Sequence, residues 1–261
     1  MKMEELFRHT FRALTEEIRQ HRDPRPMWQR RLGSTSVFCQ AVVGCGYLSE
    51  AQMQRAVERY RLGVSRDGGV IFWQIDEDGY LRDGKIMYYR SDCHRDHDRK
   101  PTWTSYLLKA SGQAPNDWKP EHCLFGLHLL SEERSVKGEE GIARRPEGES
   151  QSRTVAVVES EKTAVIMSEV KPDYLWLATG GKTELNVAKL KPLQHHKVIL
   201  FPDTDESGEA FTTWTQIAQQ ANKLYPFKHP LRISNLLEFA ASLDQKQRKI
   251  DIVDFLFETS K

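Results

Sequence analysis

The sequence predicts an α/β protein: a parallel sheet with flanking helices in the second half, preceded by a mixed α+β first half. From residue 154 onward, short apolar runs at 154–158, 175–178 and 197–201 each end in carboxylates or glycines and lead into a helical pattern. The first half instead combines helical patterns with strand-type runs around an Asp-Gly turn, which is typical of a hairpin.

The first half opens with an expected amphipathic helix over residues 3–21, whose apolar residues recur at helical spacing. Residues 36–43 and 49–60 predict two further helices, the second with Ser49 as its N-cap. A hairpin is expected next, because the strand-type runs 69–75 and 85–90 flank the turn at residues 76–79.

Residues 91–122 are polar and rich in Asp, Arg, His, Lys and Pro, which predicts a loop with few regular elements. Residues 131–153 contain almost no large apolar side chains, and this composition predicts a flexible insertion or linker. We therefore expect an N-terminal lobe over 1–130 and a second lobe over 154–261. Beyond its strand and helix alternation, the second lobe should end with a short strand at 231–233 and helices at 235–243 and 246–257.

Composition excludes several classes of protein. The 261 residues are 39% hydrophobic and 29% charged, and no apolar run approaches the roughly 18 residues that a membrane span needs. The charged start of the chain has no apolar signal core, so we expect a cytoplasmic protein without a membrane partner. Four cysteines without a CxxC pair argue against a disulfide scaffold, and a net charge of +1 argues against a strongly basic nucleic-acid binder.

The predicted strand ends carry a group of chemically active residues. Glu159, the Gly180-Gly181 turn, Asp203 and Asp205 should meet at one edge, because ligands sit at the carboxyl ends of parallel strands. Hard oxygen ligands that leave room for water and phosphate suit Mg²⁺ (or Mn²⁺), which points to phosphoryl transfer. Two other interpretations stay open. The segment around Asp203 and Asp205 can be a turn that caps a helix at 209, and Glu159 can interact with a helix dipole.

Two lysines near the expected helix starts are candidates for phosphate binding. Lys162 and Lys182 lie where backbone N–H groups already favour anions. Lys182 directly follows Gly180 and Gly181, which allow a ligand to approach the backbone closely. Each lysine can equally be an ordinary surface residue.

Taken in order, these motifs resemble the Toprim domain that is shared by bacterial primases, topoisomerases and some nucleases. Upstream segments resemble those that precede Toprim in the primase catalytic core. Within the second half, the sequences of segments 158–164 and 178–182 are similar to those of primase-like proteins of bacterial mobile elements. The resemblance covers roughly residues 36 to 225, and the segments upstream of Toprim that carry it are 60–63, 69–79, 84–89 and 123–130.

The resemblance implies a Mg²⁺-dependent, primase-like nucleotidyltransferase that uses nucleoside triphosphates on single-stranded DNA. In that case Glu159, Asp203 and Asp205 would hold the metal and act in catalysis. A Toprim nuclease would use the same acids with water as nucleophile. A third alternative is a catalytically inactive module that binds nucleic acid or a partner protein.

The sequence departs from the Toprim pattern in two places. Ser160 stands where many Toprim proteins have Gly. Replicative primases also carry a further acidic pair one strand later, and no such pair occurs at 231–235. Asp251 and Asp254 lie on a helical pattern and are poor substitutes, so we expect a weaker or single metal site.

Basic residues of the first half lie among aromatic residues, a combination that holds single-stranded nucleic acid by charge and stacking. The alternative is a solvated basic face. A helicase or a separate zinc-binding module is a further possible partner, because the paired spacing of a zinc ribbon is absent from this chain. Cys93, His94 and His97 lie within one short segment, but their spacing fits no standard zinc pattern. A solvated loop is therefore the preferred interpretation over zinc binding. The candidate nucleic-acid contacts are Arg61, Lys85, Arg99 and Lys100.

Overall fold

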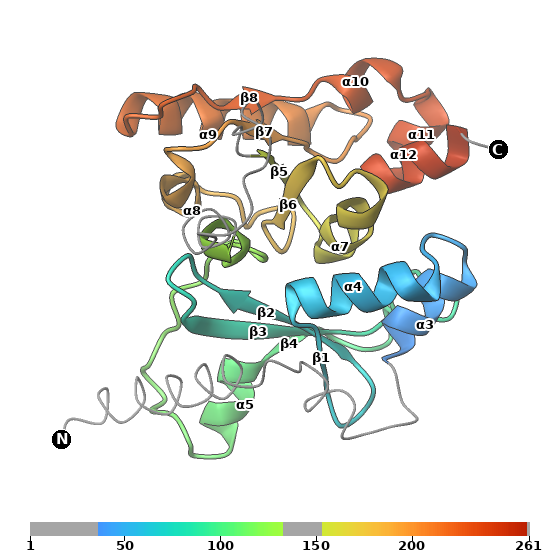
Figure 1. Cartoon of the computed structure of the whole chain (residues 1–261), viewed down its shortest axis with the longest axis vertical. Coiled ribbons are helices and arrows are strands. Elements are labelled where there is room, and N and C mark those ends of the chain that lie inside the picture. The colour runs from blue at the N-terminus through green and yellow to red at the C-terminus, as the bar shows by residue number, and fades with distance from the viewer. Residues whose placement is uncertain (1–35, 133–152, 260–261) are drawn as a thin grey trace, which may run out of the picture. The chain divides into compact units, whose positions relative to one another are not determined.

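The computed structural model describes residues 36–132 and 153–259, and the chain divides into two compact units (Figure 1). The first unit ends at His128 and the second begins at Leu129. Both units mix helices and strands, and the second contains the predicted parallel sheet. The expected helix at 3–21 and residues 133–152 of the expected insertion lie outside the described residues.

The first unit is built on a four-stranded antiparallel sheet in chain order. Its central strands confirm the predicted hairpin: Oδ1 of Asp76 accepts the N–H groups of Asp78 and Tyr80, and Gly79 adopts a φ of 80°. The second of these strands starts earlier than the expected residue 85. The strands are β1 (Gly63–Val64), β2 (Val70–Ile75), β3 (Leu81–Met87) and β4 (Thr102–Trp103).

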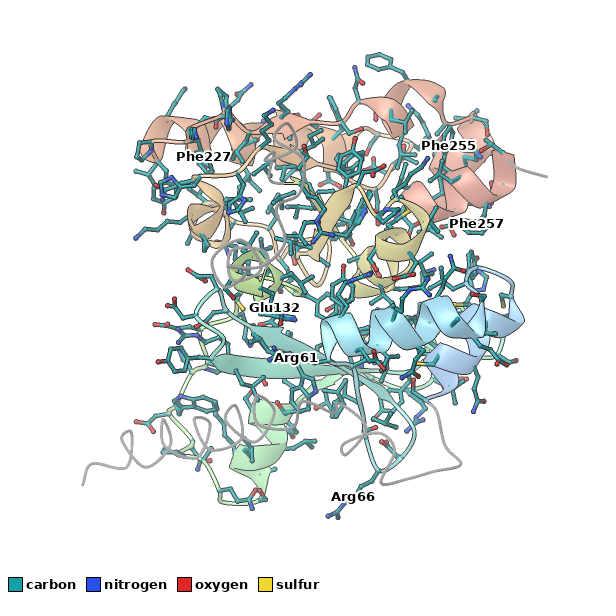
Figure 2. All side chains as sticks on the ribbon, viewed as in Figure 1. Arg61, Arg66, Glu132, Phe227, Phe255 and Phe257 are labelled. Atoms are coloured by element: carbon teal, nitrogen blue, oxygen red, sulfur yellow. The ribbon has the colours of Figure 1, made fainter. Side chains whose placement is uncertain are left out.

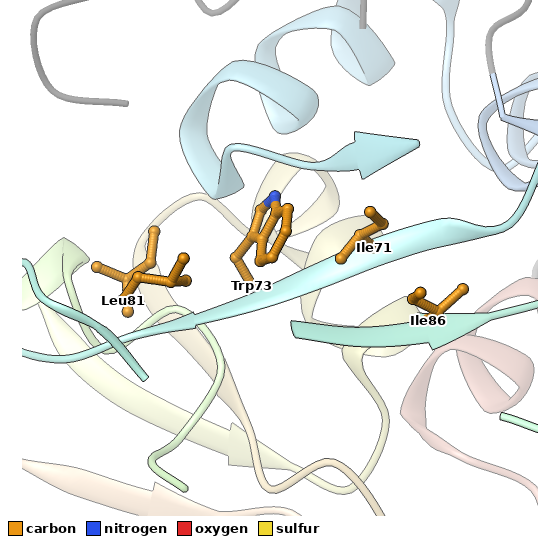
Figure 3. Packing of buried hydrophobic residues seen from close by; sticks show 5 residues of the cluster. Ile71, Trp73, Leu81 and Ile86 are labelled. Atoms are coloured by element: carbon orange, nitrogen blue, oxygen red, sulfur yellow. The ribbon is translucent and has the colours of Figure 1, made fainter. Parts of the chain in front are cut away.

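Tertiary contacts explain why β3 includes Asp83 and Gly84, which are poor strand formers. Gly84 pairs with Trp73 across the ladder, and a Cβ at Gly84 would lie 2.5 Å from the indole ring. The missing side chain therefore leaves room for the indole. One face of the hairpin thus becomes a compact apolar cluster, shown in Figure 3, which consists of Ile71, Trp73, Ile75, Leu81 and Ile86.

Two helices of the first unit agree with the sequence prediction. They are α3 (Val37–Gly44) and α4 (Glu50–Tyr60), and Ser49 forms a capping box with Gln52 at the start of α4. Phe38 of α3 packs edge-on against Phe72 of β2, with ring centroids 5.5 Å apart. These contacts bury the opposite face of the hairpin from the cluster that contains Trp73.

The polar segment 91–122 was expected to hold few regular elements, yet it contains β4 and the helix α5 (Thr104–Ala110). The helix start lacks a local side-chain cap. Instead Asp83 of β3 accepts the backbone N–H and the hydroxyl of Ser105, at 3.0 and 2.6 Å, and the hydroxyl of Thr104 at 2.8 Å. Because this cap comes from a residue more than twenty positions away, no local pattern reveals it.

The second unit confirms the predicted alternation of strands and helices. Its sheet has the order β6-β5-β7-β8, and every neighbouring pair is parallel. Helices α7 (Glu161–Val170) and α9 (Glu209–Leu224) follow β5 and β7, and the short α8 (Val187–Leu190) and η1 (Lys191–Leu193) follow β6. The strands are β5 (Thr154–Val158), β6 (Tyr174–Ala178), β7 (Val198–Leu200) and β8 (Arg232–Ile233).

The C-terminal region differs from the two helices that were expected. It contains α10 (Leu236–Ala240), α11 (Leu243–Arg248) and α12 (Ile252–Thr259). Ser242 starts α11 with a capping box, and Lys249 ends it in the left-handed region with a φ of 56°. Figure 2 labels Phe255 and Phe257 on α12. Within the described ranges, no helix is long and apolar enough to cross a membrane.

Candidate active site at the carboxyl edge of the parallel sheet

The strand order creates a topological switch point in the second unit. From β5 the chain moves to β6 on one side and then crosses to β7 on the other. In doubly wound sheets, ligands bind at such a point, outside the carboxyl ends of the two strands that flank it. Glu159 directly follows β5, and Asp203 lies three residues after the last residue of β7. The topology therefore places the two predicted site residues on either side of this switch point.

The ends of β5 and β6 are joined by backbone contacts. The carbonyl of Glu159 accepts the N–H of Gly180 at 3.0 Å and the hydroxyl of Thr179 at 3.2 Å. Gly180 has a φ of 94° and Gly181 a φ of 157°, both of which side chains rarely adopt. The two glycines thus turn the chain sharply beside Glu159, as the phosphate-binding prediction for this segment requires, although that role stays a prediction.

Asp203 is a carboxylate of this edge that lies among other negative charges. Its side chain is half-buried and accepts none of the hydrogen bonds found among the described residues. Burial raises its pKa well above the usual 3.8, and the negative charges of Asp251, Glu159 and Asp254 raise it further, while Lys162 acts in the opposite direction. A carboxylate in this setting gains from any cation that approaches it.

Asp205, in contrast, is fully engaged by protein groups. Its Oδ1 accepts the hydroxyl of Ser207 at 2.6 Å and the N–H of Glu209 at 3.0 Å, and its Oδ2 accepts the N–H of Ala210 at 2.8 Å. Burial would raise the pKa of Asp205, but these hydrogen bonds outweigh it and lower the pKa to about 2. Asp205 therefore caps α9, as the turn interpretation expected, and its role as a metal ligand stays a prediction.

Asp251 and Asp254, which were expected to be poor substitutes for the missing acidic pair, lie within electrostatic reach of Asp203, and their poor suitability as metal ligands stays a prediction. Both carboxylates act electrostatically on Asp203, so they belong to the same acidic cluster. Asp251 is held there because the hydroxyl of Thr163 on α7 donates to its Oδ2. Its Oδ1 accepts the N–H groups of Val253 and Asp254 at 2.8 and 2.9 Å, which caps α12.

Sequence reasoning missed this cluster because its partners come from separate elements. The N–H of Thr204, just after β7, donates to the carbonyl of Ile250 at 3.1 Å. This backbone contact brings the start of α12 to the end of β7. An Asp before an apolar run signals a helix start at Asp251, but only the tertiary fold shows which strand that start adjoins.

The lysines of this edge are partly paired with carboxylates. Nζ of Lys182 lies 2.8 Å from Oε2 of Glu209 on α9, and both side chains are more than half exposed. Lys189 was not foreseen. Its buried Nζ donates to the carbonyl of Thr179 at 3.4 Å and pairs with Glu184 at 3.0 Å, which fixes the segment after β6. Phosphate binding by Lys182 and by Lys162 stays a prediction.

This edge suits a divalent cation only if water and substrate phosphate supply most of the ligands. No group of three or more His, Cys, Asp or Glu side chains is placed to hold a metal ion within residues 36–132 and 153–259. Mg²⁺ is nonetheless often held by one or two carboxylates together with water and substrate phosphate. Glu159 and Asp203 fit that arrangement, because Asp203 has repulsive neighbours and accepts no hydrogen bond from the residues that the structure describes. The residues do not form an all-protein metal cage.

The predicted nucleic-acid contacts all lie in the first unit, in differing environments. Arg99 pairs with Asp67 at 2.5 Å and lies 3.5 Å from the ring centre of Tyr88, so its charge is compensated. Arg61 ends α4 in the left-handed region. Lys85 of β3 pairs with Trp103 of β4, and Lys100 is exposed. Figure 2 shows Arg66, which the prediction did not include, extending away from the ribbon.

The Cys93 segment shows no sign of a metal centre. Cys93 is buried with a φ of 62°, whereas the side chains of His94 and His97 are exposed. Nδ1 of His94 lies 3.0 Å from the carbonyl oxygen of Asp92, and the N–H of His94 donates to the same residue's carboxylate. In the described part of the chain this segment is therefore a hydrogen-bonded loop.

Comparisons with known proteins give one family and three solved structures. The family model described as a domain of unknown function (DUF6371) matches residues 37–204. The primase fragment of the bacteriophage T7 primase-helicase protein matches with 16% identity and a TM-score of 0.40, over 75% of this chain and 63% of that one. This chain thus spans less than two thirds of that fragment. No curated protein matches the chain.

The other two structures cover more of the chain. A DnaG primase catalytic domain bound to single-stranded DNA matches with 13% identity and a TM-score of 0.49, over 98% of this chain and 85% of that one. The E. coli primase catalytic core matches with 12% identity and a TM-score of 0.42, over 99% and 83% of the two chains.

Proposed function

The chain belongs to the DUF6371 family, and we propose that it is a Mg²⁺-dependent, primase-like nucleotidyltransferase that acts on single-stranded DNA. One observation carries the proposal: Glu159 and Asp203 flank the switch point of a parallel sheet, beside a Gly-Gly turn. The motif order that resembles Toprim supports the same conclusion. The finer assignment of a Toprim lobe, and of a role in a bacterial mobile element, is part of this proposal.

The residues at this edge would have different roles in the reaction. Glu159 and Asp203 would hold Mg²⁺ or Mn²⁺, which when bound neutralises charge that develops on the reacting phosphate. Lys162, whose charge already acts on Asp203, would contact the triphosphate of an incoming nucleotide. Asp205 keeps the loop after β7 fixed through its cap on α9, so that Asp203 keeps its position.

The first unit would hold the template. Lys100 is exposed, and Lys85 pairs with the aromatic residue Trp103 across the β3–β4 ladder, a setting that suits charge and stacking contacts with single-stranded DNA. Arg61 and Arg99 are proposed as weaker contributors, since Arg99 already pairs with Asp67. A helicase or a separate zinc-binding module would complete the system as a partner.

One experiment separates the candidate activities. The protein is incubated with single-stranded DNA, labelled ribo- and deoxynucleotides, and Mg²⁺ or Mn²⁺. We expect extension products from the wild type and none from Glu159→Gln, while DNA binding stays nearly unchanged because the carboxylate acts at the phosphate. Glu206→Gln is the matched control, since Glu206 is an exposed carboxylate of the neighbouring loop. Extension by Glu159→Gln at the wild-type rate would contradict the proposal.

A catalytically inactive module is the second candidate, and a specific observation favours it. Both oxygens of Asp205 are occupied by protein donors, so fewer carboxylates are available to a metal than in the predicted site of Glu159, Asp203 and Asp205. A wild-type protein that neither extends nor cleaves DNA with either cation would establish this candidate. Shortened DNA would instead identify a nuclease.

A further inference from the structure

Lys182 and Glu209 form a bridge across the end of β5. Lys182 follows β6 and Glu209 begins α9, which follows β7, while β5 lies between these strands in the sheet. The ion pair of 2.8 Å therefore joins the two elements that flank the strand carrying Glu159. The charges of Asp205 and Glu159 also act on Lys182, which places its ammonium group near this edge.

This bridge is weak enough to open. The side chains of Lys182 and Glu209 are 52% and 65% exposed, and exposed ion pairs contribute little to stability. Two N–H groups at the start of α9 are not available to a phosphate, because Asp205 already accepts the N–H groups of Glu209 and Ala210. Lys182 is thus a cation that an anionic ligand at this edge can reach, and Glu209 competes for it.

We infer that the Glu209 carboxylate occupies the position on Lys182 that a phosphate group takes when a polyphosphate ligand binds. The ligand must therefore displace Glu209 and place one of its own oxygens on Lys182. The inference rests on the phosphate-binding role proposed for this edge. Glu209 then sets the affinity for polyphosphate groups, since ligands with too little negative charge cannot displace it. It acts through Lys182 and needs no contact with the substrate.

Calorimetry with inorganic tripolyphosphate in excess MgCl₂ tests the exchange. We expect Glu209→Gln to bind tripolyphosphate about two- to fivefold more tightly than the wild type, because the competing carboxylate is gone. The gain should shrink at high salt, since the pair is exposed. Lys182→Ala should bind more weakly, and Glu209→Gln in the Lys182→Ala background should add nothing.

Glu206→Gln is the matched control, because it removes one negative charge from the same loop and Glu206 bonds only Gln247 among the described residues. An equal gain in affinity in this control would overturn the inference. So would an effect of Glu209→Gln that persists in the Lys182→Ala background. The inference also fails if neither the wild type nor any variant binds tripolyphosphate. The outcome is separable from the proposed function. The exchange stands if the affinities shift as expected in a protein that incorporates no nucleotide, and it fails if an active enzyme shows unchanged affinities.

Discussion

Replacing Asp203 by Asn should stabilise the protein at neutral and alkaline pH. The carboxylate is repelled by three negative neighbours, Asp251, Glu159 and Asp254, while the cation Lys162 opposes them. Because the pKa of Asp203 is raised in the folded state, the folded protein binds a proton at this carboxylate more tightly than the unfolded chain does. The associated stability is fully present below the unfolded pKa of 3.8 and is lost as the pH rises through the folded pKa. Asn keeps the shape without the charge.

The magnitude follows from the charge balance around Asp203. The three carboxylates repel the charge of Asp203 and Lys162 attracts it, and the raised pKa means that burial and repulsion together outweigh the attraction. As a general scale, one net like charge about 7 Å away costs about 0.6 kcal/mol in bulk water and about 2.4 kcal/mol at an effective dielectric constant near 20. We take about 1–2 kcal/mol as the gain, which corresponds to an increase in Tm of roughly 2–8 °C for a protein of this size.

Thermal unfolding of wild type and Asp203→Asn between pH 4 and pH 8.5 measures this effect. The Tm difference should be near zero at the acidic end and grow as the pH rises. Added MgCl₂ should raise the Tm of the wild type more than that of the variant, because a cation relieves the same repulsion. A Tm difference that does not vary with pH, or a variant that is less stable at pH 8, would refute the reasoning.

The remaining predictions concern other contacts. Asp205→Asn should lower stability by about 1–2 kcal/mol at pH 7 because α9 loses its cap; the loss should fade as the pH falls from 3.8 towards about 2, where wild-type Asp205 is itself protonated, and acid titration of unfolding measures it. Gly84→Ala should cost about 1–3 kcal/mol in chemical denaturation because its Cβ meets the Trp73 ring, and much of this cost should vanish in a Trp73→Leu background. Replacing Lys85 and Lys100 by Ala should weaken binding of single-stranded DNA and flatten its salt dependence in fluorescence anisotropy; an unchanged slope would place the DNA elsewhere.

The sequence alone determined the elements whose signals are local. The capping box at Ser49, the Asp-Gly turn at Gly79 and the buried runs of β5, β6 and β7 each depend on neighbours a few positions away. Parallel strands expose their carboxyl ends at one edge, so the grouping of Glu159 with Asp203 also followed from the pattern. Local signals in the C-terminal region were present but overlooked, since Ser242 and Gln245 mark the start of α11.

Only the tertiary structure decided which carboxylates are engaged and which are not. Asp203 and Asp205 are equivalent in the sequence, one residue on either side of Thr204. The fold gives Asp205 the N–H groups of α9, whereas Asp203 is repelled by Asp251 and accepts no hydrogen bond within the described part of the chain. Likewise α5 forms because Asp83 caps it from a distant strand. Such differences depend on contacts between residues far apart in the chain, and the charge and hydrogen bonding of a site are set by those contacts rather than by local pattern.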